Sequence, residues 1–378
     1  MRERDPHDPA TVATRYWQRL DDGRLECQLC PRCCRLREGQ RGLCFVRAAR
    51  SGERGGEVVL TTYGRSSGLY LDPIEKKPLN HFLPGTAVLS LGTAGCNLFC
   101  KFCQNWELSK SRELARLAEP AEPEQIAEAA VRYGAHSVAY TYNDPVIFHE
   151  YAIDTAAACR ARGIDSVAVT AGYICEEPRR EFFAAMDAAN IDLKAFSERF
   201  YRHLTGAQLA PVLETLEYVY YETDVWLELT TLLVPGENDS DREIAGMARW
   251  VAEHLGPQVP MHFTAFHPAF KMVQARATPI ETLRRARQIA MAEGVRYVYI
   301  GNVHDRAASS TYCHHCGALL IERIGYTLGA WQLDSAGRCA QCATPCAGVF
   351  AARGPHVLCQ NGEQIDVQNP SGFTPREW

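Results

Sequence analysis

From about residue 86 onward, short apolar runs alternate with segments whose apolar residues recur at helical spacing. The run TAVLSLGT (86–93) is typical of a buried strand. The segment EPEQIAEAAVRYG (122–134) is typical of a helix, because Pro123 lies near its start and Gly134 at its end. The same pattern predicts further strands at 137–143, 165–173, 190–196, 224–234, 259–268 and 297–303. It predicts helices between them at 146–162, 178–186, 242–255 and 280–293, and two short helical stretches before 224.

Strands that alternate with helices at this spacing predict βαβ units around a parallel sheet, and hence an α/β fold. Six βα units followed by a last strand fit an open, TIM-like partial (β/α)6 barrel over residues 86–303 better than a closed eightfold barrel. In such folds the chemistry lies at the C-terminal ends of the strands. Two cysteine-rich segments, at about 24–50 and 310–352, flank this core as small modules.

The composition is ordinary and excludes some classes of function. The 378 residues are 46% hydrophobic and 22% charged, which is typical of a globular protein. No apolar run approaches the ~18 residues that a membrane-spanning helix needs. Because the polar N-terminus also carries no signal-peptide core, we expect a cytoplasmic protein without a membrane partner. The net charge of −5 argues against a general nucleic-acid-binding protein.

The 16 cysteines carry most of the chemical information. In a reducing cytosol, clustered cysteines are more often metal ligands than disulfides. Cys159 and Cys175 stand alone and are interpreted as buried core residues, whereas Cys359 has no interpretation. The others form three clusters, with five cysteines between 27 and 44, three between 96 and 103, and five between 313 and 346.

The middle cluster lies in the loop after the first predicted barrel strand, where an active site is expected. Cys96, Cys100 and Cys103 have the spacing C-x3-C-x2-C. Three thiolates can hold three irons of a [4Fe–4S] cluster, which leaves the fourth iron open, as catalysis at a metal requires. The alternative is half of a zinc site that borrows a distant fourth ligand.

Further motifs accompany this triplet. They are DPIEKKPLNHFLPG ahead of it, GCNLFCKFCQNW around it, and AYTYNDP, DLKAF, LLVPGEND and HFTAFHPAFKM after it. With these motifs the chain resembles radical S-adenosylmethionine (radical SAM) enzymes, in the branch of the pyruvate formate-lyase activating enzymes. It resembles the radical enzyme of the AmmeMemoRadiSam system more closely, over about residues 25–350.

The resemblance implies both cofactors and a reaction. The amino and carboxylate groups of S-adenosylmethionine would bind the open iron of the [4Fe–4S] cluster. Reductive cleavage would give methionine and a 5′-deoxyadenosyl radical, which abstracts hydrogen from an organic substrate such as a protein or peptide. This oxidoreductase-like chemistry implies a strongly reducing cluster, an electron donor such as flavodoxin or ferredoxin, and a site that is covered when occupied.

The resemblance also assigns residues to S-adenosylmethionine. Phe102 precedes the last cysteine of the triplet, where relatives place an aromatic residue near the adenine. Asn143 and Asp144 stand where relatives carry a glycine-glycine-glutamate motif for the methionine amino group. Here Tyr142 and Asn143 replace the two glycines, and the acid is aspartate.

Two further residues are assigned to the cofactor in the same way. Lys194 in DLK would face the methionine carboxylate as a point charge, and His267 in FHP aligns with a histidine beside the cofactor of activating enzymes. Plainer roles remain open. Asp144 could cap the following helix, Lys194 could be a surface lysine, and His267 could be a turn histidine.

The N-terminal cysteines predict a metal centre of their own. The segment CQLCPRCCRLREGQRGLC opens with C-x2-C and continues into a compact loop, which is a good metal signature. The resemblance favours Cys34 over Cys33 as the third ligand. Zinc in a closed four-cysteine site and an auxiliary iron–sulfur cluster both remain open for the set Cys27, Cys30, Cys34 and Cys44.

The C-terminal cysteines predict a zinc-ribbon-like module. Two C-x2-C knuckles, Cys313 with Cys316 and Cys339 with Cys342, are 22 residues apart, which is typical of structural zinc. Such a metal would stabilise a small module with little core. Cys346 exceeds this four-cysteine set.

Two classes of function follow from these observations. The first is an enzyme with radical SAM chemistry, and the alternative is a metal-ribbon interaction protein on a degenerate radical SAM scaffold. The intact triplet favours the enzyme, because a scaffold needs no open metal site.

Overall fold

The computed structural model of the protein describes residues 4–5, 8–51, 56–110, 119–350 and 363–365. Cys359 lies outside the described residues. None of the helices in the described ranges combines the length and the apolar character needed to cross a bilayer.

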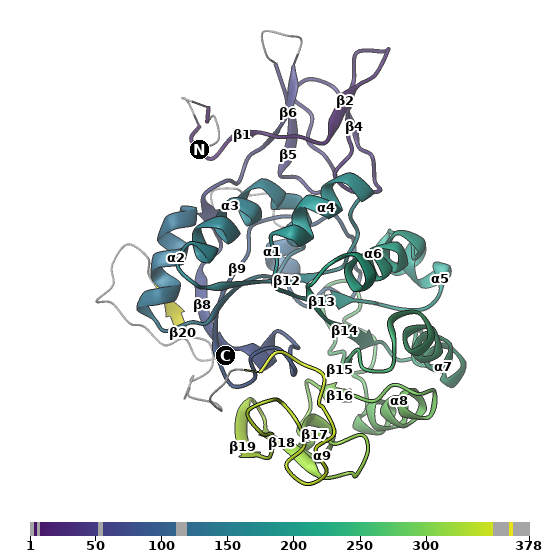
Figure 1. The fold of residues 1–378 in the computed structure, drawn as a ribbon. Coiled ribbons are helices and arrows are strands. Elements are labelled where there is room, and N and C mark those ends of the chain that lie inside the picture. The colour runs from purple at the N-terminus through teal and green to yellow at the C-terminus, as the bar shows by residue number, and fades with distance from the viewer. Residues whose placement is uncertain (1–3, 6–7, 52–55, 111–118, 351–362, 366–378) are drawn as a thin grey trace.

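A curved sheet forms the centre of the molecule (Figure 1). Within the described residues it has nine strands in the order β16-β15-β14-β13-β12-β11-β9-β8-β20. The strands from β9 to β16 run parallel, while β8 pairs antiparallel with β9, and β20 with β8. Their bounds are β8 Leu69–Pro73, β9 Ala87–Leu91, β11 Ser137–Tyr140, β12 Asp165–Thr170, β13 Ala188–Asp192, β14 Trp226–Leu233, β15 Met261–Ala265, β16 Val298–Gly301 and β20 Glu363–Ile365.

Helices cover the outer face of this sheet (Figure 1). Buried apolar side chains of the strands and of the inward helix faces form the main core, while Val88, Ala139 and Val167 of the strands belong to a separate, smaller cluster. The larger helices are α2 Pro123–Arg132, α3 His149–Arg160, α4 Glu176–Ala184, α6 Ala210–Glu222, α7 Asp241–Trp250 and α8 Ile280–Ala292. The shorter ones are α1 Trp106–Ser109, α5 Glu198–Phe200, α9 Arg306–Ser309 and the single turns Ile74–Lys76, Pro145–Phe148, Tyr201–Thr205 and Val251–Leu255.

The predicted α/β fold is confirmed, since six βα units and a last parallel strand are present in the described part of the chain. The helix expected from 146 begins differently. Pro145 opens a 3-10 turn to Phe148, and the α-helix starts only at His149, because proline fixes its own φ and cannot donate a backbone hydrogen bond.

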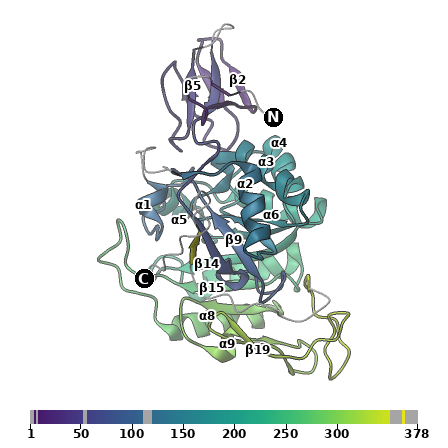
Figure 2. The ribbon, with the colours of Figure 1, turned by 90° about the vertical axis from the view of Figure 1, so that its left-hand side faces the viewer.

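Two small modules lie on opposite sides of the barrel (Figures 1 and 2). The N-terminal module contains one antiparallel sheet of β1, β6 and β5 and another of β2, β3 and β4. Its strands reach beyond the predicted range 24–50, because β5 pairs with β6, and β6 pairs on its other side with β1. The bounds are β1 Val12–Ala13, β2 Trp17–Arg19, β3 Leu25–Cys27, β4 Arg35–Leu36, β5 Arg47–Arg50 and β6 Glu57–Leu60, and the bridging pair is β7 Arg65–Ser66 with β10 Glu119–Pro120.

The C-terminal module is an antiparallel sheet of β17 Thr311–Tyr312, β18 Leu319–Ile324 and β19 Thr327–Trp331, followed by the second cysteine knuckle. It packs against the end of the barrel where the parallel strands begin. There His81 Nε2 and the Tyr299 hydroxyl form a hydrogen bond of 2.5 Å, and His81 Nδ1 lies 2.6 Å from the Ala347 carbonyl oxygen. Burial lowers the pKa of His81 to about 4, so this histidine is neutral near pH 7.

A buried ion pair ties the N-terminal module to the barrel. Arg47 of β5 and Glu150 of α3 are 1% and 0% exposed, and the guanidinium binds both carboxylate oxygens. Arg47 Nε also donates to the Ile147 carbonyl at 3.2 Å. If one partner were removed, the other would be a buried charge without a counter-charge and without water to solvate it.

We expect Glu150→Ala to destabilise the protein by about 3–5 kcal/mol, since it leaves Arg47 buried without its counter-charge. The matched control is Glu57→Ala, which removes a partly exposed partner of Arg50 at 2.8 Å and should cost less than about 1 kcal/mol. Chemical denaturation of both variants side by side measures the difference. Equal losses would contradict the assignment of this pair as the main tether.

Candidate active site

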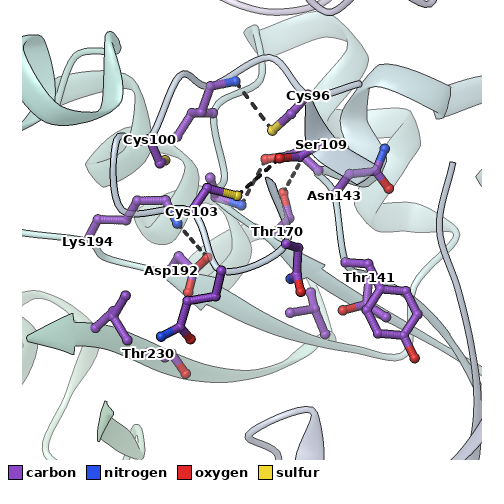
Figure 3. A pocket seen from close by; sticks show the side chains of 18 of the residues that line it. Cys96, Cys100, Cys103, Ser109, Thr141, Asn143, Thr170, Asp192, Lys194 and Thr230 are labelled. Carbon is purple, nitrogen blue, oxygen red and sulfur yellow. Dashed lines mark hydrogen bonds and ion pairs between the residues drawn. The ribbon is translucent and has the colours of Figure 1, made fainter. Parts of the chain in front are cut away.

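A cavity of about 350 Å³ lies at the C-terminal ends of the parallel strands (Figure 3). Successive strand ends and the loops after them supply its walls, which is the usual location of the active site in barrels of parallel strands. The side chains discussed below come from the cysteine loop after β9 and from the ends of β11, β12, β13 and β14. They are Cys96, Cys100, Phe102, Cys103, Ser109, Asn143, Asp144, Thr170, Asp192, Lys194 and Thr230.

The three cysteines of the triplet all line this cavity. Burial raises the pKa of Cys96 and raises that of Cys100 to about 12, so neither thiol ionises readily by itself near pH 7. Cys103 Sγ lies 3.1 Å from the Ser109 hydroxyl oxygen, and the backbone N–H of Leu98 donates to Cys96 Sγ at 3.5 Å. Because a bound metal deprotonates a thiol outright, these buried thiols suit a metal better than free thiolate chemistry.

Among the described residues that line the cavity there is no fourth cysteine and no histidine. Gln104, Asn105 and Ser109 also line the cavity and are weak ligands for iron compared with a thiolate. The two lining carboxylates, Asp144 and Asp192, already accept hydrogen bonds from Thr170 and Lys194. A metal cluster held by the triplet would therefore keep one position without a protein ligand.

Asn143 braces the loop that carries the triplet. Its Nδ2 donates to the Gly95 carbonyl at 2.9 Å and to Thr93 Oγ1 at 3.2 Å, while its Oδ1 accepts from the Thr93 backbone N–H at 3.0 Å. The preceding Tyr142 has φ of 68°, a conformation that is uncommon for a bulky residue and marks local strain. Asn143 lines the cavity, but its amide is already occupied by the loop before Cys96.

Asp144 combines a helix cap with a tie between strands. Its Oδ1 accepts from the Val146 backbone N–H at 3.1 Å, which is the capping contact, and from Thr170 Oγ1 at 2.9 Å. Its Oδ2 accepts from the Ala171 backbone N–H at 3.0 Å. Burial raises the pKa of Asp144 above its usual value. Oδ2 accepts one hydrogen bond here, so it retains capacity for another donor in the cavity.

Lys194 lies inside the cavity wall, where its side chain is only 14% exposed, so it is not a surface lysine. Its Nζ donates to Asp192 Oδ2 at 2.7 Å (Figure 3). Burial alone would lower the pKa of Lys194, but the charge of Asp192 and its hydrogen bond raise it above the usual value, so the ammonium stays charged. A fixed cation thus faces the cysteine loop.

The two remaining predicted residues differ in their placement. Phe102 is 3% exposed, lines the cavity and packs against Phe200 at 5.5 Å between ring centroids. His267 is exposed and lies outside this cavity, in a second, shallow cavity that shares Gln104 and Asn302 with the first. His267 lines this second cavity and not the triplet's own, because the buried Phe266 takes the inward position before the chain turns. The role of His267 beside the cofactor stays a prediction.

The sequence analysis missed a charged group in the same cavity. Lys76 and Lys77 both line it and both donate to Asp72, at 2.8 and 2.7 Å, and the Tyr142 hydroxyl donates to Asp72 at 3.2 Å. Lys77 is 3% exposed, and burial lowers its pKa. The two adjacent lysines in the motif DPIEKKPLNHFLPG were the available signal.

The Thr230 hydroxyl also lines the cavity and has no hydrogen-bond partner among the described residues.

The four predicted C-terminal ligands converge, as expected. All four sulfurs lie within 4.8 Å of one another, and Cys313 Sγ–Cys342 Sγ and Cys316 Sγ–Cys339 Sγ are 3.6 and 3.7 Å apart. Zinc–sulfur bonds of ~2.3 Å in a tetrahedron place the sulfurs ~3.8 Å apart, so these distances fit one zinc ion. The fifth cysteine, Cys346, faces His81 Nδ1 at 3.9 Å.

The N-terminal cysteines are arranged differently. The predicted cysteines all line a separate small cavity, and they are Cys27, Cys30, Cys34 and Cys44. Cys33 is exposed and is not among the lining residues of this cavity. In the part of the chain that the structure describes, only the C-terminal set brings three or more cysteine, histidine or carboxylate ligand atoms within 4.8 Å of one another.

Comparison with known proteins gives a family match over part of the barrel. The family model described as the Radical SAM superfamily matches residues 90–248. The curated protein "Uncharacterized protein MJ0808" of Methanocaldococcus jannaschii is 40% identical over 328 residues, which are 86% of this chain and 96% of that protein. The "GTP 3′,8-cyclase" of Peptoclostridium acidaminophilum is 25% identical over 154 residues, which are 40% of this chain and 47% of that enzyme.

Among solved structures, a domain of the pyruvate-formate lyase-activating enzyme from Bacteroides vulgatus is similar, with a TM-score of 0.40 and 20% identity. The match covers 44% of this chain and 100% of that domain.

Proposed function

This chain belongs to the radical SAM superfamily, and we propose that it is an enzyme whose triplet Cys96, Cys100 and Cys103 holds a [4Fe–4S] cluster with one open iron. The observation that carries the proposal is that three thiols, one buried and two half-buried, line one cavity whose described lining offers no fourth thiolate or imidazole. The proposed branch is that of the activating enzymes, supported by the motifs around the triplet.

When bound, the cluster and S-adenosylmethionine supply a 5′-deoxyadenosyl radical that abstracts hydrogen from the substrate. The chain's own residues bind and orient the cofactor for this step. Cys96, Cys100 and Cys103 supply thiolates to three irons. Ser109 fixes the position of Cys103, and Asn143 fixes the start of the loop. The triplet is thereby held rigidly, as a reactive centre requires.

Asp144 and Lys194 complement the two ends of an amino acid. Asp144 Oδ2 retains acceptor capacity for an ammonium group, and Lys194 offers a charged donor for a carboxylate. Both groups must find partners once water leaves the cavity. The flat ring of Phe102 is proposed to lie beside the adenine. His267 is left out of the proposed binding set, because it lies outside this cavity.

The substrate is proposed to approach the part of the cavity lined by Lys76, Lys77 and Thr230. These side chains carry hydrogen-bond donors, which an ammonium group cannot pair with because it is itself a donor, so they are open to acceptor groups of a substrate. The Thr230 hydroxyl has no hydrogen-bond partner among the described residues. A protein or peptide is the proposed substrate class, by resemblance to the activating branch. A one-electron donor such as flavodoxin or ferredoxin in the cytoplasm is the proposed source of the electron.

The proposal is tested by anaerobic reconstitution with iron and sulfide, followed by incubation with S-adenosylmethionine and dithionite. We expect a brown protein that forms 5′-deoxyadenosine and methionine in equal amounts. A protein that binds iron in the triplet but never cleaves S-adenosylmethionine would instead favour a scaffold role.

We expect Asp144→Ala to weaken S-adenosylmethionine binding by about 1–3 kcal/mol, or roughly 5- to 150-fold, because a buried ammonium loses its acceptor. Iron content should stay unchanged. Asp144→Asn is the matched control, since it keeps an oxygen for the Val146 cap but removes the charge. Calorimetry on the reconstituted variants measures both affinities. If Asp144→Asn binds like the wild type, Asp144 acts only as a cap.

A further inference from the structure

We propose that Cys27, Cys30, Cys34 and Cys44 hold an iron–sulfur cluster, not a zinc ion, and that this cluster lies directly against the loop of the triplet. The first part stands independently of the proposed function. The second part rests on it, because it concerns two clusters in contact.

The spacing of the sulfurs distinguishes the two kinds of centre. A single zinc ion needs four sulfurs ~3.8 Å apart, and the C-terminal set has sulfur pairs at 3.6 and 3.7 Å. The N-terminal four are not gathered within 4.8 Å, yet all four line one cavity. In an iron–sulfur cluster the thiolates bind different irons with sulfides between them. The ligands of such a cluster therefore stand further apart than those of one zinc ion, and the N-terminal four meet this condition as lining residues of one cavity.

The surroundings of this cavity suit a buried anionic cluster. Cys27 is buried and Cys30, Cys34 and Cys44 are half-buried, so the site is largely shielded from water. Two arginines, Arg32 and Arg47, line the cavity, whereas no carboxylate does among its described lining residues. Arg47 is already paired with the buried Glu150, so Arg32 is the arginine of this lining whose charge is available to offset the negative charge that thiolate-bound clusters carry. Arg32 Nη2 is buried and has no hydrogen-bond partner within the described chain.

The ligand loop of this centre touches the ligand loop of the triplet. A Cβ atom on Gly95, which has φ of +84°, would lie 2.1 Å from the Cys44 carbonyl oxygen, so only glycine permits this approach. Arg32 Nε donates to the Asn97 carbonyl, and Asn97 also lines the N-terminal cavity. Arg32 further lies over the Phe99 ring at 4.9 Å. Gly95, Asn97 and Phe99 flank Cys96 and Cys100 in the sequence.

This contact has a chemical consequence for the electron that the reaction consumes. An external one-electron donor, such as a reduced flavodoxin or dithionite, can reduce the N-terminal cluster, which passes the electron to the triplet's cluster and returns to its oxidised state. No bond forms or breaks in this transfer. The Gly95–Cys44 contact gives it a short path through the protein.

The metal content decides the first part. We compare the wild type with Cys96→Ala/Cys100→Ala/Cys103→Ala and with Cys27→Ala/Cys30→Ala, each reconstituted anaerobically with iron, sulfide and zinc. The triplet variant should retain about half of the wild-type iron and acid-labile sulfide, with zinc unchanged. A triplet variant without iron but with additional zinc would overturn the cluster assignment and leave the proposed enzyme function intact.

The triplet variant keeps all four N-terminal cysteines, so the result does not depend on whether Cys27→Ala/Cys30→Ala folds. Cys33→Ala, which changes the neighbouring exposed thiol, is the control and should retain full iron content. Electron paramagnetic resonance tests the contact. The reduced wild-type spectrum should be broadened relative to the sum of the two single-cluster variants. A wild-type spectrum equal to that sum would overturn the proposed contact.

Discussion

Replacing Cys96, Cys100 and Cys103 together by alanine is expected to reduce 5′-deoxyadenosine formation to the level seen without enzyme, a loss of more than about 100-fold. Groups that act as one unit lose their function together, and three of the four irons lose their thiolates. All three cysteines line the cavity at the strand ends. Product analysis by liquid chromatography under dithionite measures the effect.

The matched control for this variant is Cys159→Ala. Cys159 is fully buried on α3 and is packed in the main core, so its replacement removes a buried thiol without touching the cavity. Its 5′-deoxyadenosine formation should stay within about threefold of the wild type. Full activity of the triple variant would exclude the triplet as the cluster site.

Removing the C-terminal metal is expected to unfold the C-terminal module. Apparent metal-binding energies of structural zinc sites are about 10–16 kcal/mol, and small modules of this kind depend on them. The buried cluster of this module is small, with Leu320, Ile321 and Leu333 packed around the cysteines. We therefore expect Cys339→Ala/Cys342→Ala to lose zinc and to lose hydrogen-exchange protection over 311–331.

The loss of hydrogen-exchange protection should extend to the end of the barrel where the parallel strands begin, because His81 contacts both Tyr299 of β16 and Ala347 of the module. Cys346→Ala is the control, since Cys346 is outside the four-sulfur set and should leave the zinc in place. Hydrogen exchange measured by mass spectrometry compares the variants. Unchanged protection over 311–331 in a zinc-free variant would show that the module folds without metal.

Much of the fold is readable from the sequence because its signals are local. A strand buried on both faces and an amphipathic helix each leave a periodic pattern within one segment, and the order of these segments predicts a parallel sheet. The two C-terminal knuckles were predictable for the same reason, since each knuckle is a local motif. Helix starts were less accurate, as at Pro145, because one residue decides them.

The candidate site was predictable where a motif marks it and not where distant segments meet. The triplet and Lys194 were named from motifs, and the structure places them in one cavity. His267 lies in the adjoining shallow cavity, because the direction of a side chain after a strand depends on the turn that follows. The pair Lys76 and Lys77 was overlooked, since its position in the cavity depends on the antiparallel strand β8 joining the sheet beside β9.

The sequence by itself determined the alternation of strands and helices, the three cysteine clusters and the order in which they occur. Only the tertiary structure decided the spacing of the sulfurs and which clusters touch. The four cysteines of the C-terminal module gather tightly. The four cysteines of the N-terminal module are not gathered in this way and line a cavity. The contact of Cys44 with Gly95 joins residues far apart in the chain. Spacing and contact of this kind depend on how separate segments pack, and packing is a property of the whole folded chain.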